Sequence, residues 1–200
     1  KFRGRKYGKA VLVNNAGALG PLVPVEQLAG RLQAVRSAID VNLTACFVAT
    51  AAFLAEYCQA NFPSLKDVVL VDVSSGAADF PLEYWSLYCS VKAARLMQTK
   101  VMAAESKLKA KQCAEAGLPA PVSVHAISYS PGIMDTALQA EIAEAADHPS
   151  KTFLGNVVSS GKAVPTAESA KEMLKVIDTV ATLDNGAFVS MVARRPEFAP

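Results

Sequence analysis

The stretch from Val68 to Arg95, VVLVDVSSGAADFPLEYWSLYCSVKAAR, decides the fold. It opens with an apolar run typical of a buried strand, which we expect to end at Ser74 and Ser75. A short loop leads into a helical pattern that carries Tyr88 and Lys92, which are four residues apart and so share one helix face. A strand, a loop and a helix form half of a βαβ unit, in which ligands lie beyond the carboxyl ends of the strands. The stretch therefore predicts an α/β fold with a site at that edge of the sheet.

A hydroxyl, a phenol and an ammonium in one place suit carbonyl chemistry. Reduction of a ketone needs a hydride, which no side chain supplies, so we expect a nicotinamide cofactor. A phenol ordinarily has a pKa of about 10, and we expect the Lys92 ammonium to lower the pKa of Tyr88. Tyr88 could then act as a general acid or base, while Ser75 donates a hydrogen bond to the carbonyl oxygen. The Tyr-x-x-x-Lys spacing alone is also typical of a solvated helix face, and the upstream serines make it more specific.

This arrangement of Ser75, Tyr88 and Lys92 resembles that of the short-chain dehydrogenase/reductase family. Asn14-Asn15-Ala16-Gly17 is similar to the NNAG motif of that family, and Asn42 matches the Asn of its Asn-Ser-Tyr-Lys tetrad. The Pro131-Gly132 pair, followed by Thr136, resembles its loop after the sixth strand. The resemblance covers nearly the whole chain. It implies the C-terminal part of a Rossmann-like, doubly wound parallel sheet with flanking helices.

The resemblance also implies a role for each matched residue. Tyr88 would be the acid, Lys92 would tune it and bind the ribose, Ser75 would contact the carbonyl, and Asn42 would position a water on the proton path. The residues implied to bind the cofactor, NADPH rather than NADH, are Asn15, Ala16, Gly17, Tyr88, Lys92, Pro131, Gly132, Met134 and Thr136. Those implied to contact the substrate are Ser75, Tyr88, Gly132 and Ser190.

Within the family the likeness is strongest to the sepiapterin reductases, in the segments Leu87-Tyr88-Cys89, Lys92-Ala93-Ala94-Arg95 and Asn185-Gly186-Ala187. This implies an NADPH-dependent reductase of a small-molecule ketone. Those enzymes hold the pterin ring with an Asp in the last strand, where Ser190 stands in this chain. A serine cannot pair with an NH-rich ring as a carboxylate does. Reduction of α-diketones such as benzil is therefore the alternative.

The front of the family pattern has no counterpart in these 200 residues, which contain no Thr-Gly-x-x-x-Gly-x-Gly loop. In the family such a loop holds the pyrophosphate at a helix N-terminus. We expect a single domain, residues 1–200, that is N-terminally truncated, is a fragment and binds the cofactor poorly. The strand Val11–Val13 would then be an exposed sheet edge. A truncated, non-catalytic paralogue that acts as a dimerising or binding partner is a second alternative.

Composition narrows the remaining function classes. The net charge of +2 gives no case for nucleic acid or a membrane surface, and the longest apolar run, Ala45–Ala55, is too short to span a bilayer. Four cysteines without C-x-x-C spacing indicate reduced thiols in a cytoplasmic protein, and two isolated histidines give no metal-site pattern. By resemblance, two long helices would pair with those of a second copy in a homodimer.

Phe80, Pro81, Tyr84 and Trp85 lie close to Tyr88 in the sequence. They are expected either to line an apolar substrate wall or to belong to the core, and the sequence favours neither.

The remaining helices and strands are predicted from periodicity and from helix-breaking residues. By resemblance, the segment from Ala146 to Ser160, which Pro149 interrupts, would be a variable substrate lid. Strands are expected over Val122–Ile127 and Ala187–Val192. Helices are expected over Glu26–Asn61, over Leu82–Met102 with a charged extension to Gln112, over Thr136–Ala146, and over Thr166–Thr182 with Thr166 as the cap.

Overall fold

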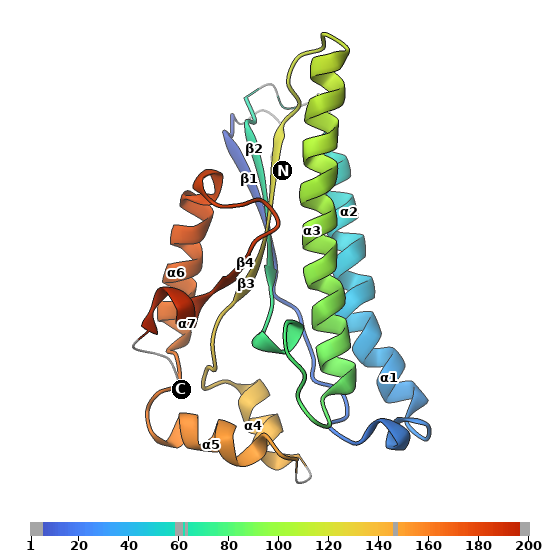
Figure 1. Ribbon diagram of the computed structural model, residues 1–200, viewed down its shortest axis with the longest axis vertical. Helices are drawn as coiled ribbons and strands as arrows, with labels where there is room; N and C mark the ends of the chain where they lie inside the picture. The colour runs from blue at the N-terminus through green and yellow to red at the C-terminus, as the bar shows by residue number, and fades with distance from the viewer. Residues whose placement is uncertain (1–5, 59–61, 63, 146–147, 197–200) are drawn as a thin grey trace.

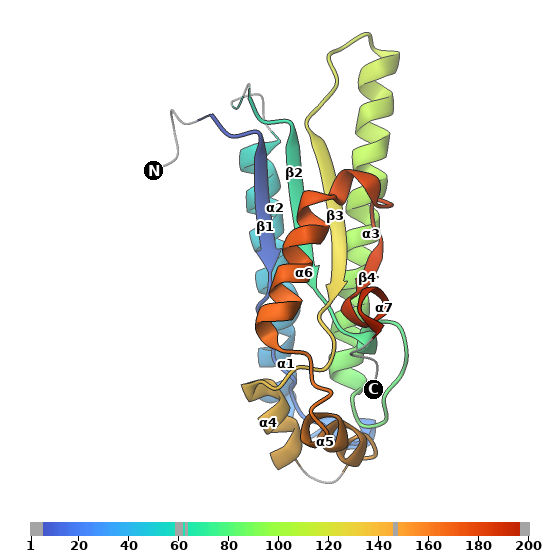
Figure 2. The ribbon, with the colours of Figure 1, turned by 90° about the vertical axis from the view of Figure 1, so that its left-hand side faces the viewer.

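The computed structural model describes residues 6–58, 62, 64–145 and 148–196. Its four strands form one parallel sheet in the order β1 (Lys9–Asn14), β2 (Asp67–Val73), β3 (Ser123–Ser130) and β4 (Phe188–Ser190). Helices α2 and α3 cover one face of the sheet and α6 covers the other (Figure 1, Figure 2). This layered parallel sheet with flanking helices confirms the predicted fold class.

The helices are long on the faces of the sheet and short at its carboxyl edge, where α4 and α5 lie beyond the strand ends (Figure 1). Their bounds are α1 Leu32–Ile39, α2 Ala45–Tyr57, α3 Ser86–Glu115, α4 Ala137–Glu144, α5 Lys151–Ser159, α6 Thr166–Asp178 and α7 Met191–Arg194. A π-helical turn, Asp40–Thr44, joins α1 to α2 without a break.

Strand β2 is buried on both faces, as its uninterrupted apolar run predicts. Val69 and Val71 are 0% exposed and belong to the core cluster that also contains Ile127 and Val176. Alternation along the strand turns Asp72 to the opposite face, where it meets α3. Burial of each such valine contributes roughly 1.5–3 kcal/mol, so the central strand is a rigid base for the residues that follow it.

Helix α3 buries one stripe of side chains at helical spacing, from Leu87 to Ala103. Beyond Ala103 most of its side chains are exposed, which confirms the predicted charged extension. Its last turn is closed by a hydrogen bond from the Leu118 amide to the Cys113 carbonyl, with Gly117 at a φ of +64°. The half of this helix that carries Tyr88 and Lys92 is therefore the half that packs on the sheet.

The ends of the predicted helices are less accurate than their positions. Helix α3 begins at Ser86 rather than near Leu82, because Tyr84 has a φ of 71°, which a right-handed helix excludes. The predicted helix ends at Asn61 and Ala146 lie outside the described residues.

Helix α2 is buried only along part of its surface. Cys46 and Thr50 are buried, whereas Phe47 is 44% exposed. The helical run Leu32–Tyr57 has 26 residues and passes the length and composition test for a membrane span, which core helices of soluble proteins also pass. The expectation that the apolar run is too short rested on Ala45–Ala55 alone, and the helix is longer because it continues through the π-helical turn.

The structure differs from three further expectations, which concern α6, the last strand and α5. Thr166 is the first residue of α6 but makes no side-chain cap, because Pro165 occupies the cap position. The last strand is shorter than predicted, since the Ser190 hydroxyl accepts a hydrogen bond from the Ala193 amide and starts α7. Helix α5 occupies part of the stretch expected only as a variable lid.

The edge position of β1 is confirmed. In the described residues this strand pairs with β2 alone, and Val11 is 39% exposed. Its other edge therefore has unpaired backbone groups in the part of the chain that the structure describes.

Candidate active site

Ser75 is placed by the turn that follows β2. The Ser74 amide donates to the Tyr129 carbonyl at 2.7 Å, which extends the sheet contact by one residue. The Ser75 side chain then accepts a hydrogen bond from the Ala77 amide at 3.2 Å and caps the turn Gly76–Ala78. This local bond fixes the hydroxyl at the carboxyl edge of the sheet, within hydrogen-bonding reach of Tyr88.

Tyr88 and Lys92 lie on the buried stripe of α3, with exposed fractions of 7% and 3%. The Lys92 ammonium lies 5.5 Å from the centroid of the Tyr88 ring and donates to the Val73 carbonyl at 2.8 Å. The predicted grouping of hydroxyl, phenol and ammonium is therefore present. The end of β2 anchors the lysine directly.

The pKa of Tyr88 is raised, whereas the sequence-based expectation was that it would be lowered. Burial is the largest influence and raises the pKa of the phenol above its usual 10.0, while a hydrogen bond with Ser75 and the charge of Arg95 lower it. Lys92 is not among the groups that shift it, because an ammonium with a pKa of about 8 has lost its charge before a phenol with a pKa above 10 titrates. The predicted lowering of this pKa by Lys92 is wrong for this structure. Tyr88 is therefore a neutral phenol at neutral pH, which is the form in which a phenol can donate a proton.

Lys92 is perturbed in the opposite direction. Burial, reinforced by the nearby Arg95 guanidinium, lowers the pKa of the Lys92 ammonium from 10.5 to about 8, and the charges of Asp72 and Cys46 act to raise it. A lysine with this pKa is largely protonated at neutral pH and loses its proton within the mildly alkaline range. It can therefore pass a proton as well as bind a hydroxyl.

Asn42 sits in the π-helical turn and is 0% exposed. Its amide nitrogen donates to the carbonyls of Ala18 and Ala38, both at 2.8 Å, and its Oδ1 accepts from the Ala18 amide at 3.3 Å. A π-turn exposes backbone groups that a regular helix would pair internally, and such turns occur often at functional sites. Asn42 thus holds the loop after β1, a contact the sequence did not predict.

The space beside the Asn15–Gly17 loop shows whether the residues present could hold a nicotinamide cofactor. A Cβ atom on Gly17 would lie 3.3 Å from Asn42 Oδ1 and 3.7 Å from Lys92 Nζ, so a glycine keeps this space open. The loop, the Tyr88 phenol and the Lys92 ammonium surround one region, and their donor groups fit the ribose and nicotinamide half of a dinucleotide. The cofactor would supply the hydride, and Asn15, Ala16, Gly17, Tyr88 and Lys92 would hold that half.

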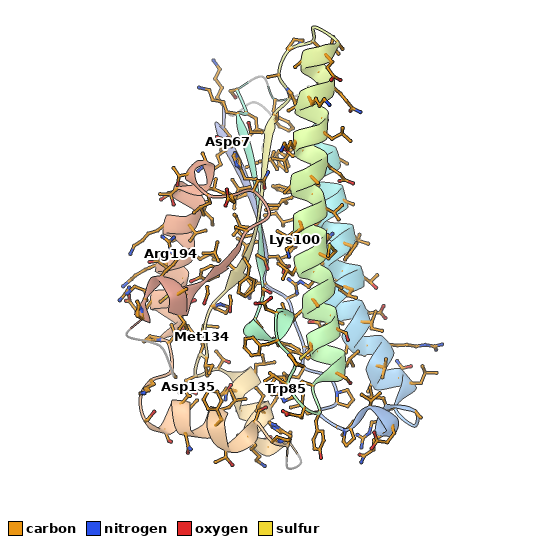
Figure 3. All side chains as sticks on the ribbon, in the orientation of Figure 1. Asp67, Trp85, Lys100, Met134, Asp135 and Arg194 are labelled. Carbon is orange, nitrogen blue, oxygen red and sulfur yellow. The ribbon has the colours of Figure 1, made fainter. Side chains whose placement is uncertain are left out.

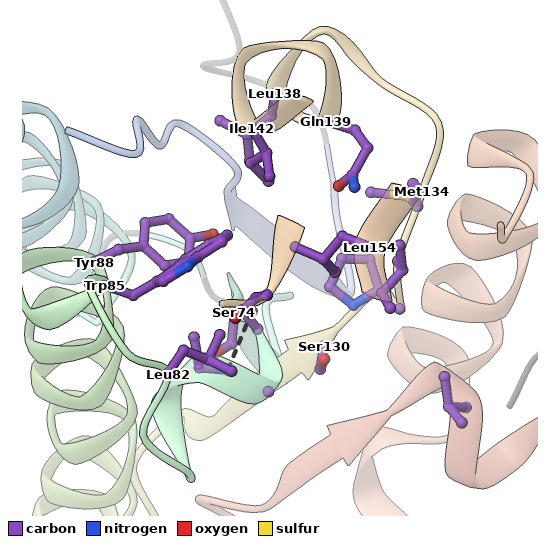
Figure 4. Close-up of a pocket in the computed structure, with 18 of the residues that line it drawn as sticks. Ser74, Leu82, Trp85, Tyr88, Ser130, Met134, Leu138, Gln139, Ile142 and Leu154 are labelled. Atoms are coloured by element: carbon purple, nitrogen blue, oxygen red, sulfur yellow. Dashed lines mark hydrogen bonds between the residues drawn. The ribbon is translucent and has the colours of Figure 1, made fainter. Parts of the chain in front are cut away.

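A pocket of about 490 Å³ is lined by Ser75 and Tyr88, among other residues (Figure 4). Its lining includes seven of the predicted site residues: Ser75, Tyr88, Pro131, Gly132, Met134, Thr136 and Ser190. Gly132 has a φ of +83°, and a Cβ there would come within 2.8 Å of Val164, so the position requires glycine. The other predicted residues, namely Asn15, Ala16, Gly17, Asn42 and Lys92, are outside this lining.

The pocket walls are uncharged: no Asp, Glu, Lys, Arg or His is among the lining residues that the structure describes. Phe80 and Trp85 both line it, and Trp85 is also part of a core cluster, so both interpretations of these aromatics hold for Trp85. Pro81 and Tyr84 are not in the lining. Figure 3 places Trp85 and Met134 at the edge of the sheet that faces α4 and α5.

Sequence reasoning missed two parts of the site. Leu138, Ile142 and Leu154 from α4 and α5 close the pocket, and their helical spacing alone does not reveal which face meets the site. Arg95 and Asp72 form a buried ion pair near Lys92. The signal for that pair was available, because a lone Asp in a buried strand needs a partner.

Comparison with known proteins identifies the family. The family model described as short chain dehydrogenase matches residues 5–147. The chain is 32% identical over 173 residues to a sepiapterin reductase of Xenopus tropicalis, covering 85% of this chain and 59% of that protein. It is 34% identical over 137 residues to a benzil reductase ((S)-benzoin forming) of Bacillus subtilis, covering 68% of this chain and 49% of that protein.

A solved short-chain dehydrogenase/reductase from Saccharomyces cerevisiae has the same fold, with a TM-score of 0.71 at 22% identity over 99% of this chain and 70% of that one. The chain spans between 49% and 64% of the length of the first curated relatives that it matches. The family model covers more than half of the chain. The chain therefore belongs to the short-chain dehydrogenase family.

Proposed function

We propose that the protein is an NADPH-dependent carbonyl reductase whose substrate is a small, uncharged ketone. The observation that carries the proposal is the neutral phenol of Tyr88, which lines an uncharged pocket of about 490 Å³ next to Ser75. A reductase must deliver a proton to the carbonyl oxygen, and a phenol with a raised pKa holds that proton until charge develops on the oxygen.

Each residue has one task in this proposal. The Ser75 hydroxyl donates a hydrogen bond to the substrate oxygen, and Tyr88 donates the proton. Lys92 replaces the proton on Tyr88, because its own pKa of about 8 lets it exchange protons near neutral pH. Asn42 keeps the loop after β1 in place, so the cofactor edge stays aligned with these groups.

The pocket favours an apolar α-diketone such as benzil over a pterin. Its described lining carries no charge, and Ser190 stands where a carboxylate would be needed to hold an NH-rich ring. The likeness to a benzil reductase supports this class. The likeness to sepiapterin reductases supports a pterin as the second candidate, and the same assay separates the two.

We also propose a homodimer in a cytoplasmic protein, as the family resemblance implies. Support comes from large apolar side chains exposed on α2 and α3, which lie side by side on one face of the sheet (Figure 2): Phe47, Val48, Met97, Val101 and Leu108. Sedimentation analysis should give a dimer that Val48→Lys converts to a monomer. A monomeric wild-type protein would contradict the dimer.

The function is tested by NADPH oxidation in the natural chain, with any residues that flank these 200 included. Benzil and sepiapterin are offered side by side, and Ser190→Asp is compared with the wild-type protein. We expect turnover of benzil in the wild type and a shift of preference toward sepiapterin in the variant. A folded protein that binds NADPH but reduces neither compound would contradict the proposed substrate classes.

A further inference from the structure

Arg95 is a guanidinium buried behind the catalytic lysine, with an exposed fraction of 0%. It lies on α3, three residues after Lys92, and so on the same buried stripe. Its Nε donates to Asp72 Oδ1 at 2.6 Å, and its Nη2 is paired with the same oxygen. The pair joins the catalytic helix to the central strand.

The same guanidinium also holds the loop after β1. Its Nη1 donates to the Ala16 carbonyl at 3.0 Å and its Nη2 donates to the Asn14 carbonyl at 2.8 Å. Strand register places Asn14 directly beside Asp72, so one side chain reaches both strands and the loop. The planar fork of arginine provides these separate donors, which a lysine could not do.

Asn42 holds the same loop through its hydrogen bonds with Ala18. Gly17 lies in the sequence between the residues bound by Arg95 and the residue bound by Asn42. The space beside Gly17 is bounded by Asn42 and Lys92. A buried ion pair adds little net stability compared with apolar packing, so stability alone does not account for this one. Its geometry does, because it ties the loop to the helix that carries Tyr88 and Lys92.

We propose that Arg95, oriented by Asp72, is a positioning residue that fixes the Asn14–Ala16 backbone relative to the catalytic helix. The inference rests on the proposed function, since the loop and helix are where the cofactor would meet the acid. The substrate-facing side chains are unaffected, because Arg95 and Asp72 are outside the pocket lining.

Arg95 has a second, electrostatic effect on the site. The charged and titratable groups that act on Lys92 are Arg95, Asp72 and Cys46, and the Tyr88 ring lies against its ammonium. Arg95 lowers the pKa of Lys92 and Asp72 raises it, with Arg95 the larger of the two. Removal of both should therefore raise the pKa of Lys92.

The test compares Arg95→Met/Asp72→Asn with the wild type in the natural chain, without relying on turnover. The double change avoids leaving an unpaired buried charge. Hydrogen exchange at the Asn15–Ala18 amides should be roughly tenfold faster, because two hydrogen bonds from a charged donor are lost. NMR titration of the Lys92 side chain should show a midpoint above about 8.

A matched control removes another arginine–carboxylate pair, Arg194 with Glu172, in Arg194→Met/Glu172→Gln. Figure 3 shows Arg194 on α7, away from the catalytic helix. This variant should leave both readouts unchanged. Arg95→Lys keeps the positive charge but loses the planar guanidinium. It should therefore speed hydrogen exchange in the loop while leaving the titration midpoint of Lys92 low. This variant also provides the test if the double variant does not fold.

Unchanged loop exchange in both Arg95 variants would overturn the inference. NADPH affinity is measured alongside, with a roughly tenfold rise in Kd expected for the double variant. If the wild type binds no NADPH, the proposed function fails, while the exchange and titration results still decide the role of Arg95.

Discussion

The strand–helix unit Val68–Arg95 and the helix pair α4 and α5 meet at one pocket, but different interactions hold them. The helix pair is called the lid below, because its side chains close the pocket. The first is fixed by polar bonds that are buried or partly buried: Lys92 donates to the Val73 carbonyl, Arg95 donates to Asp72, and Ser75 accepts from the Ala77 amide. The lid meets the pocket through apolar side chains such as Leu138 and Leu154. Directional bonds fix atoms for chemistry, whereas apolar contacts select by shape, so the two regions should affect different kinetic constants.

The largest effect is expected from Tyr88→Phe. Loss of a general acid lowers kcat by about 10²–10⁴-fold, and the buried ring keeps its packing. Steady-state NADPH oxidation with benzil measures it. Tyr84→Phe is the matched control because Tyr84 is outside the pocket lining, and equal losses in both variants would remove Tyr88 from its assigned role.

Lys92→Met tests how strongly the first region is desolvated. Since the pKa of Lys92 falls from 10.5 to about 8 on folding, the unfolded chain binds more protons between these values. The free energy of unfolding of the wild type, relative to the variant, should therefore rise with pH through that window, by up to about 3 kcal/mol. Urea unfolding at about pH 7 and about pH 10 measures it, and a fall with pH would contradict the burial of this charge.

Leu154→Ala probes the lid. Loss of apolar contact with the substrate should raise KM roughly tenfold with little change in kcat, because the proton donor is untouched. Leu174→Ala is the control, since Leu174 is 58% exposed on α6 and outside the pocket lining. A large fall in kcat in Leu154→Ala would mean that the lid also positions the reacting groups.

Phe153→Leu should have the smallest effect. Phe153 lines the pocket but is 51% exposed, so its replacement by another apolar side chain changes little buried area. We expect KM to change by about twofold or less. A tenfold change would show that the rim of the pocket, rather than its buried wall, selects the substrate.

The two regions also differ in how far the sequence predicts them. Ser75, Tyr88 and Lys92 follow from local spacing on a strand end and a helix, so their meeting was predictable. The Arg95–Asp72 pair depends on which strand residue faces α3, and the role of Leu154 depends on how α5 folds back over the sheet. A lone Asp in a buried strand indicates that it has a partner, but local periodicity identifies neither that partner nor the way α5 folds back. The raised pKa of Tyr88 was missed for the same reason, because burial is a property of the assembled fold.

The account rests on the claim that the buried strand–helix unit keeps Tyr88 protonated until it acts. NMR titration of ¹³Cζ-labelled tyrosine, with the Tyr88 signal assigned by its loss in Tyr88→Phe, measures this directly. We predict a midpoint above the ordinary value of 10.0. A midpoint below that value would contradict the account and would restore Lys92 as the group that makes Tyr88 acidic.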